Sequence, residues 1–127
     1  MVPHSDIAAL FARGHRLPAG LLLRLRLARP GDELLLAELL AEIGVQAGEL
    51  DLARLVRFDP RRRLVVCATV LIDSTESAVG FGTITSGRGD PAPDAIVVHP
   101  EHDEVVRELL SRALTGWGRA REAGTAA

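Results

Sequence analysis

The sequence lacks several residue types, and each absence limits what the protein can be. Its 127 residues contain no tyrosine and one cysteine, Cys67, and the fifteen basic residues other than histidine are all arginine. One cysteine excludes an internal disulfide framework, and the apolar neighbours of Cys67 favour a small core residue over a nucleophile. Together with abundant alanine, leucine and glycine, the absence of lysine suggests a bacterial source with GC-rich codons.

Long apolar runs are also missing. No stretch reaches the roughly 20 apolar residues that a membrane-spanning helix needs. Residues 1–6 lack the basic start and apolar centre of a signal peptide. We therefore expect a cytoplasmic protein with no membrane partner.

The sequence has no strong excess of either charge. A net charge of −2 gives no electrostatic reason to expect nucleic acid or an acidic membrane as a partner. The only basic run is the three arginines at residues 61–63. We interpret it as a solvated turn before a strand rather than as a phosphate clamp, and we expect no nucleic-acid partner.

The composition that remains is that of an ordinary globular protein, with 47% apolar and 25% charged residues. A chain of this length can bury one core and is too short for two domains. We expect an N-terminal arm or short helix at residues 1–20, one domain at residues 21–122 and a tail at residues 123–127.

Strand and helix periodicities alternate in the first half of the domain. Residues 21–29 alternate leucine with arginine, which predicts a strand with one buried face. Asp32 then offers an N-cap, and residues 33–43 carry leucines at helical spacing. Residues 49–58 predict a shorter helix that Pro60 ends.

The second half predicts a hairpin, a short strand and a long helix. The polar residues 73–76 connect the hairpin strands, and Gly80 and Gly82 indicate a bulge or a close backbone approach. A loop follows at residues 86–94. The expected elements are strands at residues 64–72, 77–85 and 95–98 and an amphipathic helix at about residues 103–122.

These elements follow one another in the order β-α-α-β-β-β-α. We expect an α/β fold of the α+β kind. Its central sheet would be mixed but mostly antiparallel, with about four strands, and helices would flank it.

Three short segments resemble parts of one enzyme family. They are R-L-A-R-P-G-D at residues 26–32, V-G-F-G at residues 79–82 and I-V-V-H-P-E-H at residues 96–102. The first is similar to the R-x-A-x-x-x-D start of the GCN5-related N-acetyltransferase (GNAT) family, and the second to its second and third strands. The third resembles the family's fourth strand and its V-x-P-x-x-R turn. The resemblance covers about residues 21–122.

The resemblance implies acetyl transfer to an amine, with acetyl-CoA as co-substrate. In the family, the pantetheine arm pairs with the free edge of the fourth strand, which here matches Val97, Val98 and His99. The pyrophosphate lies at the N-terminus of the next helix, where backbone N–H groups and the helix dipole favour an anion. Arg107 could add a positive charge there.

A general base must lie near that strand and have a pKa tuned toward neutral, and His99 and Glu101 are the best-positioned candidates. His102 is next. The interpretation that we prefer is that residues 99–102 form a turn and a helix cap with no catalytic duty. A metal site at His99, Glu101 and His102 would lack a further ligand at a recognisable spacing, so we expect no metal.

The sequence also departs from the family. The family's phosphate loop, [QR]-x-x-G-x-[GA], uses glycines so that the backbone can approach the phosphates. Residues 102–108 read H-D-E-V-V-R-E instead, with Asp103 and Glu104 where the diphosphate would lie. The tyrosine that serves many members as general acid is absent, and no segment after residue 122 matches the family's later strands.

Two functions therefore remain open. The chain is either a GNAT-like acetyltransferase or a non-catalytic, degenerate GNAT-fold protein that acts in binding, regulation or dimeric assembly. Part of a longer or split enzyme is a third interpretation. Because an open fourth strand would expose unpaired backbone, we expect a homodimer or a partner chain that completes the sheet.

Overall fold

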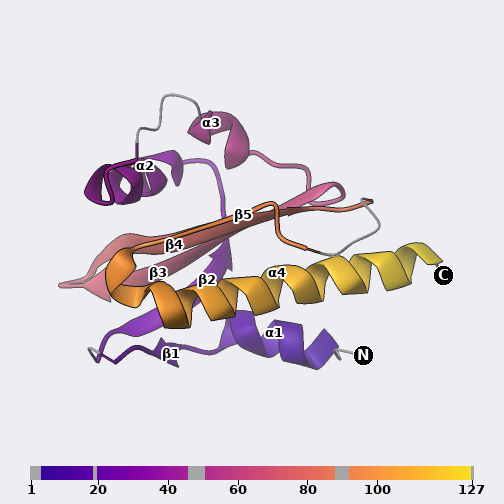
Figure 1. Ribbon diagram of the computed structural model, residues 1–127, viewed down its shortest axis with the longest axis horizontal. Helices are drawn as coiled ribbons and strands as arrows, with labels where there is room; N and C mark the ends of the chain where they lie inside the picture. Colours follow the sequence, from indigo (N-terminus) through magenta and orange to yellow (C-terminus); the bar gives the residue numbers. More distant parts are fainter. Residues whose placement is uncertain (1–3, 19, 46–50, 88–91, 127) are drawn as a thin grey trace.

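The computed structural model describes residues 4–18, 20–45, 51–87 and 92–126 and, within these, the side chains from residue 8 to residue 121 (Figure 1). A 3₁₀ turn at Pro100–His102 joins the last strand to the last helix. The helices and strands are α1 (His4–Ala12), β1 (His15–Arg16), β2 (Leu22–Leu27), α2 (Glu33–Glu42), α3 (Leu52–Leu55), β3 (Arg63–Ile72), β4 (Thr75–Thr85), β5 (Ala95–Val98) and α4 (Asp103–Ala126).

The five strands form one sheet in the order β1-β2-β3-β4-β5. Each neighbouring pair is antiparallel, so the fold belongs to the α+β class. The predicted mixed sheet of about four strands is wrong in two respects, since the described strands include no parallel pair and a fifth strand is present. That strand, β1, has two residues, which is too short to show a periodicity, and it lies in the segment predicted to be an arm or a short helix, where the structure also has α1.

Helices cover both faces of the sheet. Helices α2 and α3 lie on one face, and α1 and α4 lie on the other (Figure 1). Val66 and Val70 of β3 belong to the core beneath α4, whereas Val65 and Cys67 belong to the core beneath α2. Because β3 is buried on both faces, its apolar run is continuous rather than alternating.

Helix α4 approaches β4 closely at two glycines. A Cβ atom on Gly80 would lie 2.9 Å from Val106 Cγ1, and one on Gly82 would lie 2.6 Å from Leu114 Cδ1. Real Cβ atoms do not approach carbon this closely, so only glycine leaves room for the helix. The predicted close backbone approach is confirmed.

The hairpin of β3 and β4 also contains the predicted bulge. Ala68 pairs with Gly80, and the next residue, Thr69, pairs with Ala78. Val79 is therefore an extra residue in β4, which bends the strand and increases its twist.

The turn of this hairpin is shorter than predicted. β3 ends at Ile72 and β4 begins at Thr75, so two residues connect them rather than four. Asp73 and Ser74 have φ values of 50° and 67°. Positive φ at both positions is type I′ geometry, which matches the twist of the flanking strands and lets β4 start two residues earlier.

The helices on the α2 face agree with prediction only in part. α2 matches the predicted helix to within one residue. α3 covers four residues instead of the predicted 49–58, of which 49 and 50 lie outside the described residues. The chain leaves the helix after Leu55 and brings Phe58 against both cores, and this packing outweighs the local helical pattern.

Helix α4 begins where predicted but is longer. It continues to Ala126, so residues 123–126 are helical and not a tail. Gly116 and Gly118 are buried in the helix, and packing outweighs their low helix propensity. None of the helices in the described part of the chain is both long and apolar enough to cross a membrane.

Replacing Gly82 with alanine should lower the free energy of unfolding by about 1–3 kcal/mol, because the new methyl group would overlap Leu114. Urea denaturation measures the loss. Leu114→Val removes the overlapping methyl, so the double variant should lose less stability than the sum of the two single losses. Additive losses would contradict the close approach.

Candidate functional site

The candidate site lies where β5 ends and α4 begins, at one end of the sheet (Figure 1). β5 pairs with β4 from Ala95 to Val98, and the backbone N–H of His99 donates to the carbonyl of Val79 at 2.8 Å. The 3₁₀ turn then leads directly into α4. The predicted site residues therefore lie in one continuous stretch of chain, from Val97 near the end of β5 to Arg107 in α4.

His99 uses both of its ring nitrogens. Its Nδ1 accepts a hydrogen bond from the backbone N–H of Glu101 at 3.2 Å, which caps the 3₁₀ turn. Its Nε2 lies 3.5 Å from the carboxylate of Glu42 at the end of α2. Because a backbone N–H can only donate, the proton of the neutral ring is on Nε2, facing Glu42. Neither nitrogen offers a free lone pair, so the arrangement suits a cap better than a general base.

Glu101 and His102 lie beside His99. Glu101 is exposed, and among the described residues no group donates a hydrogen bond to its carboxylate. The centroid of the His102 ring is 6.1 Å from that of His99. The structure therefore brings the three residues together but does not link them into a proton relay.

The free edge of β5 is where Val97 and Val98 were expected to hold a pantetheine arm. Because the N–H of His99 faces β4, alternation directs the backbone groups of Val97 toward β4 as well. Those of Ile96 and Val98 face the open edge. Of the two predicted valines, only Val98 presents its N–H and carbonyl outward.

Arg107 covers part of this edge. Its Nε and Nη2 donate to Asp103 Oδ1 at 3.0 and 2.7 Å, one turn earlier in α4. Its Nη1 donates to the carbonyl of Ile96 at 3.4 Å. The guanidinium group is thus engaged by the chain's own oxygens.

The start of α4 is acidic. Asp103 and Glu104 lie in its first turn, and Glu101 precedes it. The helix dipole stabilises carboxylates at this position, so negative charge already occupies the place that an anionic ligand would take. In the described part of the chain, no group of three His, Cys, Asp or Glu residues is arranged to hold a metal ion.

Cys67 lies on β3, level with Val97 and separated from it by β4. Its side chain is buried under α2. Burial, together with the nearby charge of Asp32, raises the pKa of the thiol to about 12. The thiol therefore stays protonated at neutral pH, in agreement with the expected core role.

Sequence reasoning missed an ion cluster on the same face of the sheet as α2. Arg26 of β2 donates to both carboxylate oxygens of Asp32, at 2.6 and 2.8 Å, and to both of Glu76, at 3.0 Å each. Asp32 also accepts the backbone N–H of Arg29 at 2.8 Å. It occupies the predicted N-cap position of α2 but makes no capping hydrogen bond, because Arg26 and Arg29 take up its oxygens.

The cluster shifts the ionisation of all three side chains. Burial alone would raise the pKa of Asp32, but the hydrogen bonds and charges of Arg26 and Arg29 outweigh it and hold that pKa below its ordinary 3.8. Hydrogen bonds from Arg26 likewise lower the pKa of Glu76 below 4.5. The two carboxylates raise the pKa of Arg26. The site is fully charged at neutral pH and serves to hold β2, β4 and α2 together.

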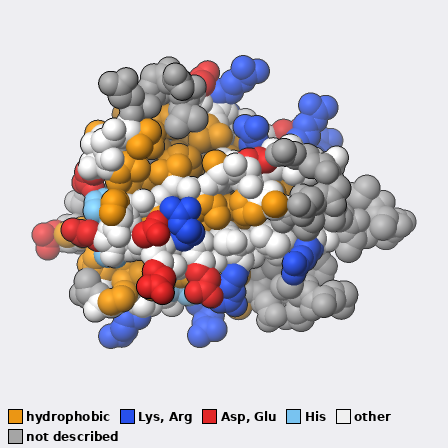
Figure 2. Space-filling model, viewed as in Figure 1, with side chains coloured by type: hydrophobic (Ala, Val, Ile, Leu, Met, Phe, Trp, Pro, Cys, Tyr) orange, Lys and Arg blue, Asp and Glu red, His pale blue; other side chains and the backbone are white. Residues whose placement is uncertain are grey.

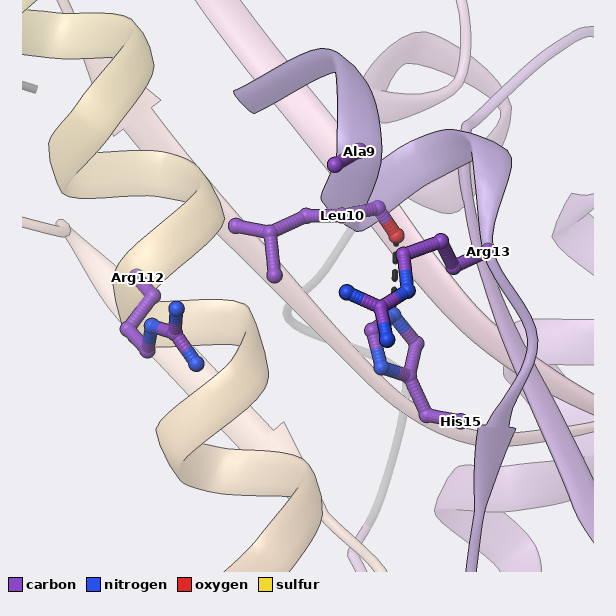
Figure 3. A pocket seen from close by; sticks show the side chains of 5 residues that line it. All are labelled: Ala9, Leu10, Arg13, His15 and Arg112. Carbon is purple, nitrogen blue, oxygen red and sulfur yellow. Dashed lines mark hydrogen bonds between the residues drawn. The ribbon is translucent and has the colours of Figure 1, made fainter. Parts of the chain in front are cut away.

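A small basic hollow lies between α1, β1 and α4. Its volume is about 300 Å³, and Figure 3 shows Arg13 above the ring of His15 with Arg112 of α4 across from them. His15 Nε2 donates to the carbonyl of Leu10 at 2.9 Å, so this nitrogen is not free. Among the described residues, neither arginine has an ion-pair partner.

Comparison with protein-family models, with curated proteins and with solved structures found no significant match.

The ion cluster predicts how stability depends on pH. Because the folded-state pKa values of Asp32 and Glu76 are lowered, their stabilisation is complete above the unfolded-state values of 3.8 and 4.5 and is lost as the pH falls below them. Asp32→Asn should lower the free energy of unfolding by about 2–4 kcal/mol at pH 7. Urea denaturation at several pH values should show this difference shrinking toward pH 3.

The control is Glu38→Gln, which neutralises an exposed carboxylate on the same helix. It should change stability by less than about 0.5 kcal/mol at any pH. An Asp32→Asn loss that stays constant down to pH 3 would contradict the electrostatic role of the cluster.

Proposed function

We propose that the chain is a GNAT-like domain that does not transfer acyl groups and acts instead in binding and assembly. The run of elements from β2 to α4, with two helices after the first strand and a helix after the last, is what suggests the GNAT-like fold. The start of α4 is what argues against transfer. There the chain's own groups take the places that acetyl-CoA would need.

The observation that carries the proposal is the position of Arg107. An acyl-CoA along β5 would pair with the outward backbone groups of Ile96 and Val98, yet Arg107 already donates to the carbonyl of Ile96. Its other nitrogens are bound to Asp103. A ligand would have to displace these hydrogen bonds before it could make its own, which lowers its net affinity.

The negative charge at the start of α4 also disfavours the binding of acetyl-CoA. A diphosphate at the start of α4 would lie beside Glu101, Asp103 and Glu104 and would compete with them for the N–H groups of the first turn. Arg107 cannot neutralise the added charge, because Asp103 already neutralises Arg107. Phosphate binding at this helix end is therefore disfavoured.

The histidine supports the proposal independently. A general base must accept a proton from the amine, whereas Nδ1 of His99 accepts the N–H of Glu101 and Nε2 carries its own proton toward Glu42. Glu101 has a free carboxylate, but it is exposed to water. Among the described residues no group donates a hydrogen bond to this carboxylate, so nothing holds it in the position that a general base needs.

The decisive ligand is S-acetylpantetheine, which carries the thioester and the arm of acetyl-CoA without its phosphates. Calorimetric titration should detect no binding at millimolar concentrations, because Arg107 covers the edge that the arm would use. Release of free thiol from acetyl-CoA, with polyamines and lysine-containing peptides as acceptors, should stay at the uncatalysed rate. The reagent that detects the released thiol should not react with the protein, because Cys67 is buried.

Two variants make the assay discriminating. Thiol release above background that is lost in both Glu101→Gln and His99→Ala would overturn the proposal and support acetyl transfer at this site. Arg24→Gln is the matched control, since Arg24 is exposed on β2 and distant along the sheet. It should leave any measured rate unchanged.

We also propose that a second copy of the chain pairs along the open edge of β5. Sedimentation velocity should then show a monomer–dimer equilibrium. Arg107→Ala should strengthen the dimer about fivefold or more, because it frees the carbonyl of Ile96 for a strand partner. Arg119→Ala, an exposed change on the same helix, should have no effect. A monomer at every concentration for both the wild type and Arg107→Ala would contradict this assembly.

A further inference from the structure

The other end of the sheet carries a second hollow, which is lined by arginines. It has a volume of about 340 Å³ and lies where β3 begins and β4 ends. Arg54 and Arg57 reach it from α3 and the residues after it, and Arg62 and Arg63 reach it from the start of β3. Figure 2 shows several basic side chains in this upper right part of the molecule, with a few acidic side chains beside them, and further basic side chains at the centre and along the lower edge.

The four arginine side chains have no acidic partner in the described part of the chain. Among the described residues, none of their side chains forms an ion pair or a hydrogen bond. Two carboxylates lie at the rim or next to it, and both have other partners. Asp59 lies 3.7 Å from Arg61 and accepts the backbone N–H of the same residue at 3.0 Å. Asp94 accepts a hydrogen bond at 2.6 Å from the hydroxyl of Thr85, which lines the hollow. Four positive charges around one small hollow repel each other, and a bound anion would relieve that repulsion.

The backbone that carries Arg61 and Arg62 is fixed rather than loosely solvated. The carbonyl of Arg62 accepts the N–H of Ser86 at 2.7 Å, and the carbonyl of Arg61 accepts Ser86 Oγ and Arg121 Nη2 at 3.0 Å each. The backbone N–H groups of Arg62 and Arg63 both donate to the carbonyl of Asp59 at 2.9 Å. The three arginines form the exposed turn before β3 that the sequence predicts, and these bonds make its backbone a preorganised support for the side chains.

We propose that this hollow binds a small polyphosphate anion, either free or carried by a nucleotide. Guanidinium groups bind phosphate oxygens in pairs, and several of them around one site suit clustered phosphates better than a single carboxylate. The half-buried Phe58 supplies an apolar wall that a nucleobase or sugar could contact. The proposal is independent of whether the chain transfers acyl groups.

The charge distribution favours a small ligand over nucleic acid. Residues 51–63 contain five arginines and two aspartates, a net charge of +3, so the rest of a chain with −2 overall carries −5. A long polyanion that left the hollow would meet this acidic surface and be repelled. A compact anion would remain within the arginines.

The test is calorimetric titration of the full chain with inorganic tripolyphosphate at an ionic strength of about 0.15 M. We expect one site with micromolar affinity. The double variant Arg54→Gln/Arg57→Gln should weaken binding at least about tenfold, because it removes two charge-assisted contacts. The matched control is Arg13→Gln/Arg112→Gln, which removes two unpaired arginines from the other hollow (Figure 3) and should change the affinity less than about twofold.

Further titrations identify the source of the phosphates. Tighter binding of ATP than of tripolyphosphate would assign the site to a nucleotide, with Phe58 contacting the base or sugar. Equal affinities would assign it to the phosphate chain alone. If the first double variant unfolds, as judged by circular dichroism, Arg62→Gln/Arg63→Gln takes its place.

Three results would overturn the proposal. They are no heat with tripolyphosphate or ATP, equal losses in the two double variants, and binding of single-stranded RNA that is tighter than binding of either small ligand. The acyl-transfer experiments give a separate answer, because S-acetylpantetheine carries no phosphate and thiol release measures chemistry rather than binding.

Discussion

The close contact between α4 and β4 is the constraint on which the rest of the fold depends. Gly80 and Gly82 let the helix lie against the strand, with Val106 and Leu114 above the two missing side chains. β5 pairs with this same part of β4, so the contact also fixes the short chain segment between β5 and α4. The positions of His99 and Arg107 therefore follow from helix packing.

The opposite face of the sheet is held by charge as well as by apolar packing. Arg26 lies on β2, Asp32 lies at the start of α2 and Glu76 lies near the start of β4. One guanidinium group thus joins three elements that are separated in the sequence. An arrangement that is this well paired has little remaining capacity to act on a substrate, and its value is structural.

The sequence predicts those features whose causes are local. The alternation of leucine and arginine in β2 and the leucine spacing in α2 follow from burial on one face. The glycines of β4 indicated a bulge or a close approach, and the structure has both. β1 could not be predicted, because two residues show no periodicity. The sequence could not pair Glu76 with Arg26, because fifty positions separate them. Asp32 was predicted to be a cap because the local pattern does not reveal that Arg26 binds its carboxylate in the folded chain.

The sequence predicted where the candidate site lies in the chain but not which contacts its side chains make. The sequence indicates that His99, Glu101 and Arg107 follow the last strand, since their spacing is fixed by the chain. It does not indicate that Glu42 faces the histidine or that Arg107 turns back to Ile96. The arginine hollow was missed for a related reason, because Arg54 and Arg57 join Arg62 and Arg63 only through the turn after α3.

The distribution of charge separates the two ends of the sheet. The end at His99 presents carboxylates, and the end at Arg63 and Thr85 carries the hollow lined by four arginines, whose side chains have no partner among the described residues. Along β4 these ends are Val79 and Thr85, six residues or roughly 20 Å apart at the rise of a β-strand. A polyphosphate held by the arginines would therefore lie far from His99 and Glu101. If a coenzyme bound to the arginines through its phosphates, its thioester would have to cross the face of the sheet to reach His99 or Glu101. Phosphate binding by this chain would therefore not by itself imply acyl transfer.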